Sequence, residues 1–426
     1  LLGISSKWII PEHKAASLLK NNLIASQGKG LRQSLEEDLK ENIIKITNPK
    51  EIIHFNRVFT IPKKDGSLRR VIDCRAVNNL TEPIHFKMDH LSRILESVYP
   101  GDWFTSLDIH AAYSHIKVDQ SLQPFLAFSV NKNIYIHTAM PFGLSRAPYI
   151  FTKILHDCLH PLQVQQRIKI FAYIDDILII SKTYAEAESQ VNRVANHLTK
   201  LGFLLAEKKC IKIPTQTITF LGWQISTKEH VSIEMTARRK EKMIHTLSKW
   251  IRSSQVNRQV KTRSLAKLIG RLNFLRSQMT FGAFHLHRLD RTKNKAVARA
   301  GWNSWLRTTP SLLKDLLWWH NQISLNVKKV YQEITPQAKL TTDASKIRWG
   351  RYQTFKHYNI KPEQTGKIHK LFNLQIKEKH AQSFAPFVIF SHFLDNRRFK
   401  VSKSPQTIQR QYLTSLGEKL LQLYQL

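Results

Sequence analysis

Cysteine, glycine and proline are all scarce in this chain of 426 residues, which contains 3 Cys, 14 Gly and 15 Pro. So little glycine and proline excludes a collagen-like or low-complexity chain. Cys74, Cys158 and Cys210 form no closely spaced pair, so neither a disulfide framework nor a zinc knuckle is predicted. Because disulfides persist mainly in oxidising compartments, we expect a reducing, intracellular setting, either cytoplasm or nucleus.

Acidic residues and long apolar segments are scarce as well. Asp and Glu number 31 against 66 Lys and Arg, so the formal net charge is +35. A charge of this size predicts a polyanionic partner, nucleic acid before an anionic membrane, although a generally basic protein gives the same count. No apolar run reaches the roughly 18–20 residues that span a bilayer, so no membrane partner is expected.

Hydrophobic residues make up 42% of the chain, which is enough for buried cores and excludes wholesale disorder. Leu1 is not a Met, and no charged segment followed by an apolar run comes after it, so no signal peptide is predicted. We expect a piece of a longer product, with further polyprotein domains outside it. The patterns favour four regions: a helical extension (1–55), a mixed region (56–235), a basic helical region (236–335) and a last segment (336–426).

Turn signals and apolar runs predict a mixture of helices and strands. Asp65-Gly66 marks a hairpin turn between strands at Val58–Ile61 and Arg70–Asp73. Thr183 and Glu186 form a capping-box pattern that begins a helix. Other expected helices are 11–24, 31–46 and 147–159, and other expected strands are 103–109, 167–170, 177–181 and a pair within 217–225.

The sharpest chemical feature is a pair of adjacent acids, Asp175 and Asp176, at a tight turn between two apolar strands. Burying two carboxylates is costly unless cations neutralise them. Asp108 ends another apolar strand, and it can lie beside Asp175 if the strands pair. Such oxygen ligands suit Mg²⁺, and two metal ions held this way can activate a 3′-hydroxyl and stabilise a leaving pyrophosphate. A solvated Asp-Asp turn is the alternative.

The motif Tyr173-Ile174-Asp175-Asp176 resembles the YxDD box of reverse transcriptases. The resemblance is collinear from residue 58 to residue 225. It includes a fingers hairpin (58–75), a first palm motif (107–113), Met140–Pro148 and a primer-grip segment (220–223). Three shorter segments, 85–88, 317–319 and 340–345, resemble LTR-like retroelements, especially the DIRS-like group.

This resemblance implies an RNA-directed DNA polymerase of a retrotransposon, a nucleotidyltransferase. The implied fold is α+β, a right-hand polymerase with fingers, palm and helical thumb. Asp108, Asp175 and Asp176 would be the catalytic, metal-binding triad, with two Mg²⁺ as cofactors and Mn²⁺ as a substitute. The implied partners are an RNA template, a DNA primer or hybrid duplex, and dNTPs.

The resemblance also implies residues that bind the incoming nucleotide. Lys63 and Arg69 would clamp the triphosphate, and basic side chains at a hairpin tip suit a polyanion. Arg70 is the candidate if the register is off by one residue. Tyr113 would exclude a ribose 2′-hydroxyl unless it is simply a core tyrosine, and Phe142 would pack beside the nucleotide.

Further nucleic-acid contacts are expected after the palm. Residues 221–223 (Leu221, Gly222 and Trp223) would hold the primer end, although a buried strand explains the same residues and both can be true. Between Thr236 and Arg307 the chain has 18 Lys or Arg and only two acids. Amphipathic helices with such a face can follow a phosphate backbone without reading its sequence, with a merely solvated face as the alternative. The expected contacts on one of these helices are Arg263, Lys267 and Arg271.

The last segment resembles an RNase H-like domain only in part. Asp343 resembles its first acid, and Glu378 is a candidate second acid. That chemistry needs several acids around two metal ions. The segment that should supply the third acid has Ser and Pro at positions 404–405, with Asp395 as a rival. We expect a partial, degenerate RNase H-like α/β segment without RNase H activity.

Two other hypotheses keep the fold but change the function. A decayed or domesticated copy would bind nucleic acid without catalysis; the degenerate last segment motivates this reading, and the intact acids argue against it. A palm-type RNA polymerase is the third reading. Tyr113 argues against it, because a small side chain there would admit ribonucleotides.

Overall fold

The computed structural model describes residues 3–22, 25–26, 31–62, 68–131, 133–331, 338–344, 349–355 and 364–366. The chain divides into two compact units, Leu1–Glu333 and Ile334–Leu426. Lys63, Glu378, Asp395 and residues 404–405 lie outside the described residues. The four predicted regions, including the boundary after residue 335, stay predictions.

The N-terminal region is mixed rather than purely helical. Its elements are α1 (Glu12–Leu19), β1 (Ala25–Ser26), α2 (Leu31–Lys40) and β2 (Ile44–Ile46). The prediction of one helix over 31–46 is wrong at its end, because Asn42 has a φ of 56° and residues 44–46 pair with β7 (Asn133–His137). The β-branched residues Ile44 and Ile46 at alternate positions also favour a strand there. The sheet order is β1-β6-β7-β2, with β6 at Ala127–Val130.

The predicted hairpin is confirmed. Strands β3 (Val58–Pro62) and β4 (Leu68–Ile72) pair antiparallel, with Val58 opposite Ile72 and Pro62 opposite Leu68. The short helices between residues 49 and 125 are α3 (Arg75–Asn79), α4 (Leu91–Leu95) and the 3₁₀ turns η1 (Pro49–Glu51), η2 (Ala112–His115) and η3 (Gln123–Phe125).

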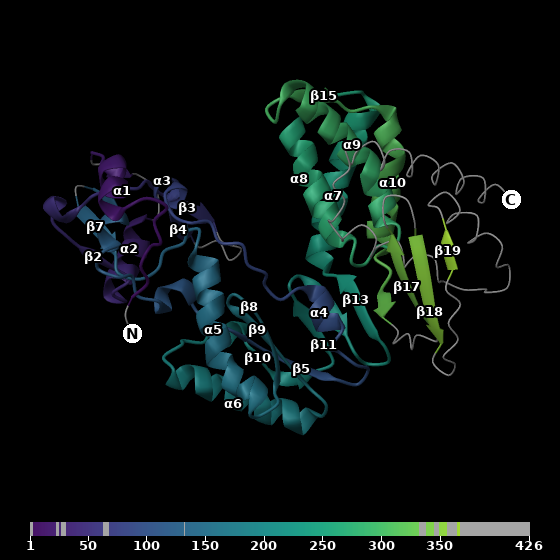
Figure 1. The fold of residues 1–426 in the computed structure, drawn as a ribbon, viewed down its shortest axis with the longest axis horizontal. Helices are drawn as coiled ribbons and strands as arrows, with labels where there is room; N and C mark the ends of the chain where they lie inside the picture. The colour runs from purple at the N-terminus through teal and green to yellow at the C-terminus, as the bar shows by residue number, and fades with distance from the viewer. Residues whose placement is uncertain are drawn as a thin grey trace. The chain divides into compact units, whose positions relative to one another are not determined.

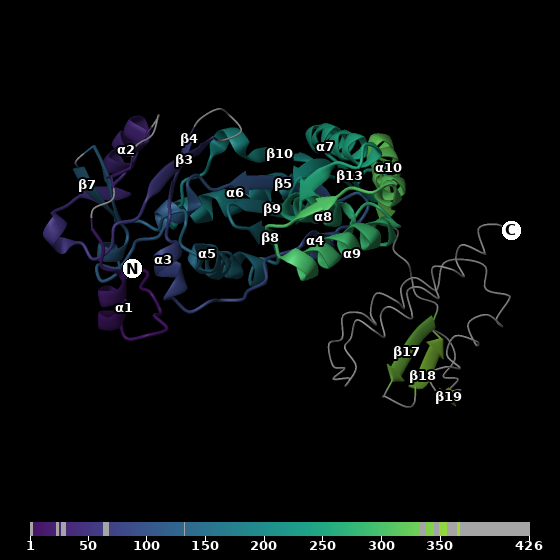
Figure 2. The same cartoon turned by 90° about the horizontal axis from the view of Figure 1, so that it is seen from above.

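A four-stranded sheet carries the three candidate aspartates. Its order is β10-β5-β9-β8, with β5 at Trp103–Asp108, β8 at Lys169–Tyr173, β9 at Asp176–Ser181 and β10 at Ile211–Thr215. Helices α5 (Ala147–Val164) and α6 (Tyr184–Lys200) pack on this sheet (Figure 1; Figure 2).

The sheet is buried on both faces. Ile177 and Ile179 join one core cluster, whereas Leu178 and Ile180 join the other. Because successive strand residues point to opposite faces, an unbroken apolar run fits this environment. The predicted capping box of α6 is confirmed: Thr183 accepts from the Glu186 amide, and the Glu186 carboxylate accepts from the Thr183 amide.

A third sheet leads into a helical region. The strands, in the order β11-β12-β13-β16, are β11 (Thr217–Phe220), β12 (Trp223–Ser226), β13 (Val231–Met235) and β16 (Lys329–Tyr331). Between β13 and β16 the chain forms four helices: α7 (Ala237–Gln255), α8 (Thr262–Leu275), α9 (Gly282–Ala300) and α10 (Pro310–Leu325). A short pair, β14 (Gln259–Lys261) and β15 (Trp305–Arg307), joins the ends of these helices. None of the helices in the described ranges has the length and apolar content to cross a bilayer.

The second unit contains a small antiparallel sheet of β17 (Ala338–Ala344), β18 (Trp349–Phe355) and β19 (Gln364–Gly366). Asp343 lies on β17, opposite Gly350 of β18. The RNase H-like character of the segment stays a prediction.

Candidate active site

Two of the three candidate aspartates face each other across neighbouring strands. Asp108 is the last residue of β5, and Asp176 is the first residue of β9, directly opposite it in the antiparallel register. Asp175 lies in the two-residue turn between β8 and β9, because Tyr173 pairs with Asp176. Its carbonyl accepts a hydrogen bond from the Ile109 amide at 3.0 Å. The fold therefore brings Asp108 next to the adjacent pair Asp175 and Asp176, which comes 67 or more positions later in the sequence.

The turn that presents Asp175 is conformationally unusual. Ile174 has a φ of 55°, a left-handed conformation that is rare for a β-branched residue. Two other non-glycine residues near the predicted site, Ala111 and Leu221, also have positive φ, at 45° and 48°. Such conformations persist only where the surrounding structure enforces them, and they concentrate at functional sites.

Lys209 is the residue at this site that the sequence did not reveal. Its Nζ donates to both carboxylate oxygens of Asp108, at 3.0 Å and 3.3 Å. The backbone delivers it there: the Ala206 amide donates to the Asp108 carbonyl at 2.8 Å, and η4 (Glu207–Lys209) follows. The run Glu207-Lys208-Lys209 has no pattern that distinguishes it from an ordinary exposed turn, so only the fold exposes this role.

The charged groups of the site lie close enough together to affect ionisation, and Lys209 is a cation beside the three carboxylates. Burial raises the pKa of Asp175, and the nearby Asp108 carboxylate raises it further. The hydrogen bond to Asp108 raises the pKa of Lys209, with further stabilisation of the ammonium by Asp175 and Asp176. A cluster of this kind favours a bound cation, because the carboxylates repel one another when ionised.

The donor chemistry fits a divalent metal, although the side chains are not gathered around one point. Within the described residues, no group of three carboxylate, imidazole or thiolate side chains is arranged closely enough to hold an ion as it stands. Carboxylate oxygens are nevertheless the ligands that Mg²⁺ takes. The site supplies only such oxygens, from Asp108, Asp175 and Asp176. Lys209 contacts the first of these.

Three of the predicted nucleotide-binding residues lie against one another. The Arg69 guanidinium is 4.7 Å from the centre of the Phe142 ring, and the Phe142 and Tyr113 ring centres are 4.8 Å apart. Tyr113 is only 6% exposed, and burial, followed by the Asp175 charge, raises its pKa to about 12. The Tyr113 hydroxyl is therefore protonated at neutral pH. Its packing in the core is compatible with both readings made from the sequence.

Arg70, the alternative to Arg69, has a different environment. Its side chain forms an ion pair with Asp38 and is 5% exposed, and its guanidinium lies 4.8 Å from the centre of the Phe128 ring. Because strand residues alternate between faces, Arg69 and Arg70 point to opposite sides of β4. Arg69 is exposed and remains available to a ligand. Lys63 lies outside the described residues.

The predicted primer-grip residues form a tight hairpin turn. Leu221 and Gly222 connect β11 and β12 with φ values of 48° and 75°, the pattern of a type I′ turn. Trp223 is 1% exposed, and its ring stacks on Phe274 of α8 with centres 5.3 Å apart. Trp223 is therefore a buried strand residue, whereas the turn itself is partly exposed.

Arg239 of α7 packs against this turn without a hydrogen-bond partner for its buried Nη1. The guanidinium lies 4.3 Å from the centre of the Phe274 ring, and burial lowers its pKa. A Cβ on Gly222 would lie 2.1 Å from Nη2 of Arg239, so only glycine leaves room for this contact. Arg239 thus joins the turn to the helical region.

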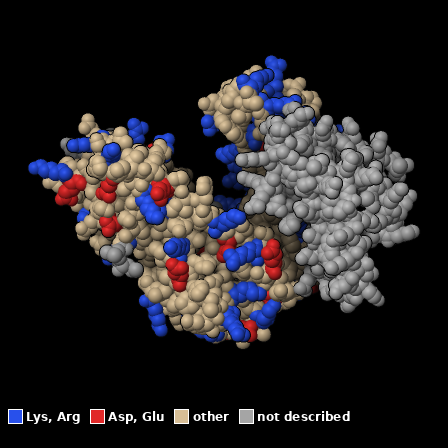
Figure 3. Space-filling model, in the orientation of Figure 1, with Lys and Arg blue, Asp and Glu red and all other residues tan. Residues whose placement is uncertain are grey.

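The three predicted contacts on α8 follow one helical face. Arg263, Lys267 and Arg271 are spaced four residues apart, and residues at this spacing are neighbours on a helix. Arg263 donates to Asn303 at 3.0 Å and Arg271 to Thr246 at 3.4 Å. Figure 3 shows Lys and Arg side chains gathered over the β15 end of the helical region, where few acids are visible.

Comparison with known proteins identifies the middle of the chain. Residues 61–225 match the family described as "Reverse transcriptase (RNA-dependent DNA polymerase)". This range contains Arg69, Tyr113, Phe142 and the three aspartates.

Similar curated proteins are retrotransposon polyproteins. The Transposon Tf2-3 and Tf2-4 polyproteins of Schizosaccharomyces pombe are each 25% identical to the chain over 330 residues. The match covers 77% of this chain but only 23% of each polyprotein. The chain thus spans about a quarter of the length of these relatives.

Solved structures show the same architecture. A foamy viral protease-reverse transcriptase, solved with double-stranded DNA, matches at a TM-score of 0.62 and 18% identity, over 97% of this chain and 85% of that one. The corresponding protein with an RNA/DNA hybrid gives a TM-score of 0.59 at 18% identity, over 85% of this chain and 47% of that one. The predicted right-hand polymerase fold is confirmed, and the DIRS-like subgroup stays a prediction. Residues 61–225 of the chain thus match a reverse transcriptase domain, and the curated proteins similar to the chain are retrotransposon polyproteins.

Proposed function

We propose that this chain extends a primer 3′-hydroxyl with dNTPs on an RNA template, as the polymerase of a retrotransposon. One observation carries the proposal: Asp108 and Asp176 face each other, Asp175 lies in the adjoining turn, and the contacting residues Arg69, Phe142 and Tyr113 lie near Asp175. Carboxylates for metal ions and a cation for phosphate are what nucleotidyl transfer requires.

Asp108, Asp175 and Asp176 would hold two Mg²⁺, with Mn²⁺ as a substitute. When bound, such ions favour attack of the 3′-hydroxyl on the α-phosphate and stabilise the leaving pyrophosphate. Lys209 neutralises part of the carboxylate charge and must share Asp108 with any bound cation. Its side chain is 66% exposed and long, so it can move away without disturbing the sheet.

The remaining residues position the substrates. Arg69 would bind the triphosphate, together with Lys63 of the same hairpin. Tyr113 and Phe142, whose rings are in contact, would form the wall beside the sugar, and the tyrosine ring would exclude a 2′-hydroxyl. The Leu221–Gly222 turn would hold the primer end, with Arg239 behind it.

The basic face of α8 would follow the phosphate backbone of the primer-template duplex. Arg263, Lys267 and Arg271 supply the charge, and the foamy viral structures with double-stranded DNA and RNA/DNA hybrid support this type of partner. Binding through phosphates should weaken steeply with salt. An intracellular setting, in cytoplasm or nucleus, is part of the proposal and is consistent with the three free cysteines.

Primer extension tests the proposal. The parent chain should extend a DNA primer on an RNA template with dNTPs and Mg²⁺, and the Asp175→Asn/Asp176→Asn variant should not. A folded parent that binds primer-template but never extends it would instead support the binding-only function. Extension that is unchanged in the variant would place the chemistry elsewhere.

A further inference from the structure

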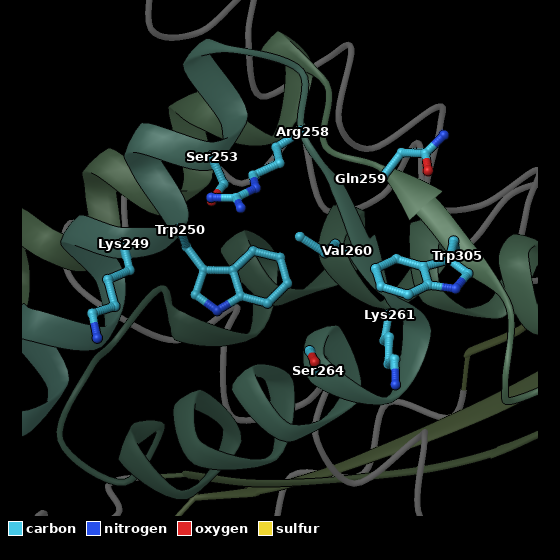
Figure 4. A pocket seen from close by; sticks show the side chains of 9 residues that line it. All are labelled: Lys249, Trp250, Ser253, Arg258, Gln259, Val260, Lys261, Ser264 and Trp305. Atoms are coloured by element: carbon cyan, nitrogen blue, oxygen red, sulfur yellow. The ribbon is translucent and has the colours of Figure 1, made fainter.

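A surface depression lies at the β14–β15 end of the helical region (Figure 4). Its volume is about 440 Å³, within the range of roughly 300–1,000 Å³ typical of ligand sites. Six of its nine lining residues are exposed, so it is an open groove and not an enclosed cavity. The lining residues are Lys249, Trp250, Ser253, Arg258, Gln259, Val260, Lys261, Ser264 and Trp305.

Two tryptophans dominate the apolar part of this depression. Figure 4 shows the Trp250 and Trp305 rings on either side of Val260. Trp250 comes from α7 and packs partly against the core, whereas Trp305 of β15 is 53% exposed. Trp302, three residues earlier, is 49% exposed but does not line the depression. Large exposed aromatic surface next to a groove is typical of a binding site.

The polar part of the depression is cationic. Lys249, Arg258 and Lys261 line it, and no Asp or Glu does. Within the described part of the chain, none of these three side chains forms an ion pair. Lys261 Nζ lies 5.5 Å from the centre of the Trp305 ring, so the charge and the aromatic surface belong to one patch. Such a patch is complementary to an anion that carries a planar group.

This depression is separate from the carboxylate site. It lies at the C-terminal end of α7, whereas β13 and the Leu221–Gly222 turn adjoin the N-terminal end. A helix of 19 residues is about 28 Å long. The depression therefore cannot be part of the primer grip or of the aspartate cluster.

We propose that this depression binds an unpaired nucleotide of a single-stranded RNA or DNA segment. A base would stack on the exposed Trp305 ring, and the flanking phosphates would contact Lys249, Arg258 and Lys261. Stacking on an aromatic side chain requires an unpaired base, because the faces of paired bases are covered by their neighbours. An open groove also suits a continuous strand better than a small molecule. This site goes beyond the polymerase function, and its existence does not depend on catalysis.

Binding of short fluorescent oligothymidine and oligouridine to the full chain tests the proposal, with a blunt duplex as the comparison. Trp305→Ala should bind the single strands roughly 5- to 150-fold more weakly, since base–aromatic stacking has this strength. Trp302→Ala is the matched control, because it removes an equally exposed tryptophan outside the groove and should change binding little. The tighter of the two oligonucleotides identifies which strand the site prefers.

Abasic oligonucleotides separate stacking from charge. Without bases, the parent and Trp305→Ala should bind equally, whereas Lys261→Gln should still weaken binding. Single-strand affinity unchanged by Trp305→Ala, or a loss equal for single strand and duplex, would overturn the proposal. The proposal would also be overturned if Trp305→Ala weakened binding of a poly-glutamate peptide but not of the oligonucleotides, because the partner would then be an acidic protein. Primer extension by the same variants reports on the polymerase function separately, so the two ideas can fail independently.

Discussion

The Gly222→Ala substitution tests whether the contact between the Leu221–Gly222 turn and Arg239 stabilises the fold. Gly222→Ala places a Cβ at a position 2.1 Å from Nη2 and 2.6 Å from Cζ of Arg239. The guanidinium must then move away from the turn, and this movement disturbs its contact with the Phe274 ring at 4.3 Å. The residue also has a φ of 75°, which alanine adopts only at a cost.

These two effects can be separated in magnitude. The left-handed backbone should cost about 1–2 kcal/mol of unfolding free energy, and the disturbed cation–π contact up to about 2 kcal/mol more. Gly202→Ala is the control, because Gly202 has a φ of 90° and no atom within 4 Å of its added Cβ. It should show the backbone cost alone.

Urea unfolding followed by tryptophan fluorescence measures both variants. The excess loss in Gly222→Ala over Gly202→Ala should vanish when both are compared in an Arg239→Ala background, since residues in contact are non-additive. Only Gly222→Ala should also weaken primer-template binding. Equal losses for Gly222→Ala and Gly202→Ala with Arg239 present would refute the contact and the reasoning that depends on it.

Three further predictions concern the carboxylate site. Tyr113→Ala should relax sugar selection, and an unchanged preference for dNTPs over rNTPs in single-nucleotide incorporation would contradict the gate role. Lys209→Met should bind Mn²⁺ several-fold more tightly in an electron paramagnetic resonance titration, because the ammonium that competes for Asp108 is gone; weaker binding would mean that Lys209 assists the ion. Because burial raises the pKa of Asp175, ionising it costs folded-state stability at neutral pH. In the presence of chelator, Asp175→Asn should melt above the parent at neutral pH, with a gap that closes as pH falls toward about 3.9, the unfolded-state value; a constant gap would contradict this.

Features that depend on local sequence were predictable. Asp65-Gly66 between two β-branched segments predicts the β3–β4 hairpin, and Thr183 with Glu186 predicts the start of α6. The sequence also predicted that strand pairing would bring Asp108 to Asp175, whereas the β5–β9 register places Asp176 directly opposite Asp108 and leaves Asp175 in the adjoining turn. Alternation along β4 follows from strand geometry once the register is known, and it separates Arg69 from Arg70.

Features that depend on distant contacts were not predictable from patterns. Lys209 lies 101 residues from Asp108 in sequence, and its neighbours carry no motif. Strand β2 has β-branched residues at alternate positions, Ile44 and Ile46, but three residues directly after a helix are too few to show a separate strand in the sequence, and its pairing with β7 reveals it. Arg239 looked like one more basic residue of an amphipathic helix, although it packs on the ring of Phe274 and against Gly222.

The central claim is that Asp108, Asp175 and Asp176 form the site of metal-dependent primer extension. Single-nucleotide extension, titrated with Mg²⁺, tests it most directly when Asp108→Asn is compared with Asp157→Asn, an exposed aspartate of α5. We expect the parent and Asp157→Asn to extend with the same Mg²⁺ dependence, and Asp108→Asn to bind primer-template but fail to extend it at any Mg²⁺ concentration. Extension by Asp108→Asn with an unaltered Mg²⁺ dependence would contradict the assignment of the site.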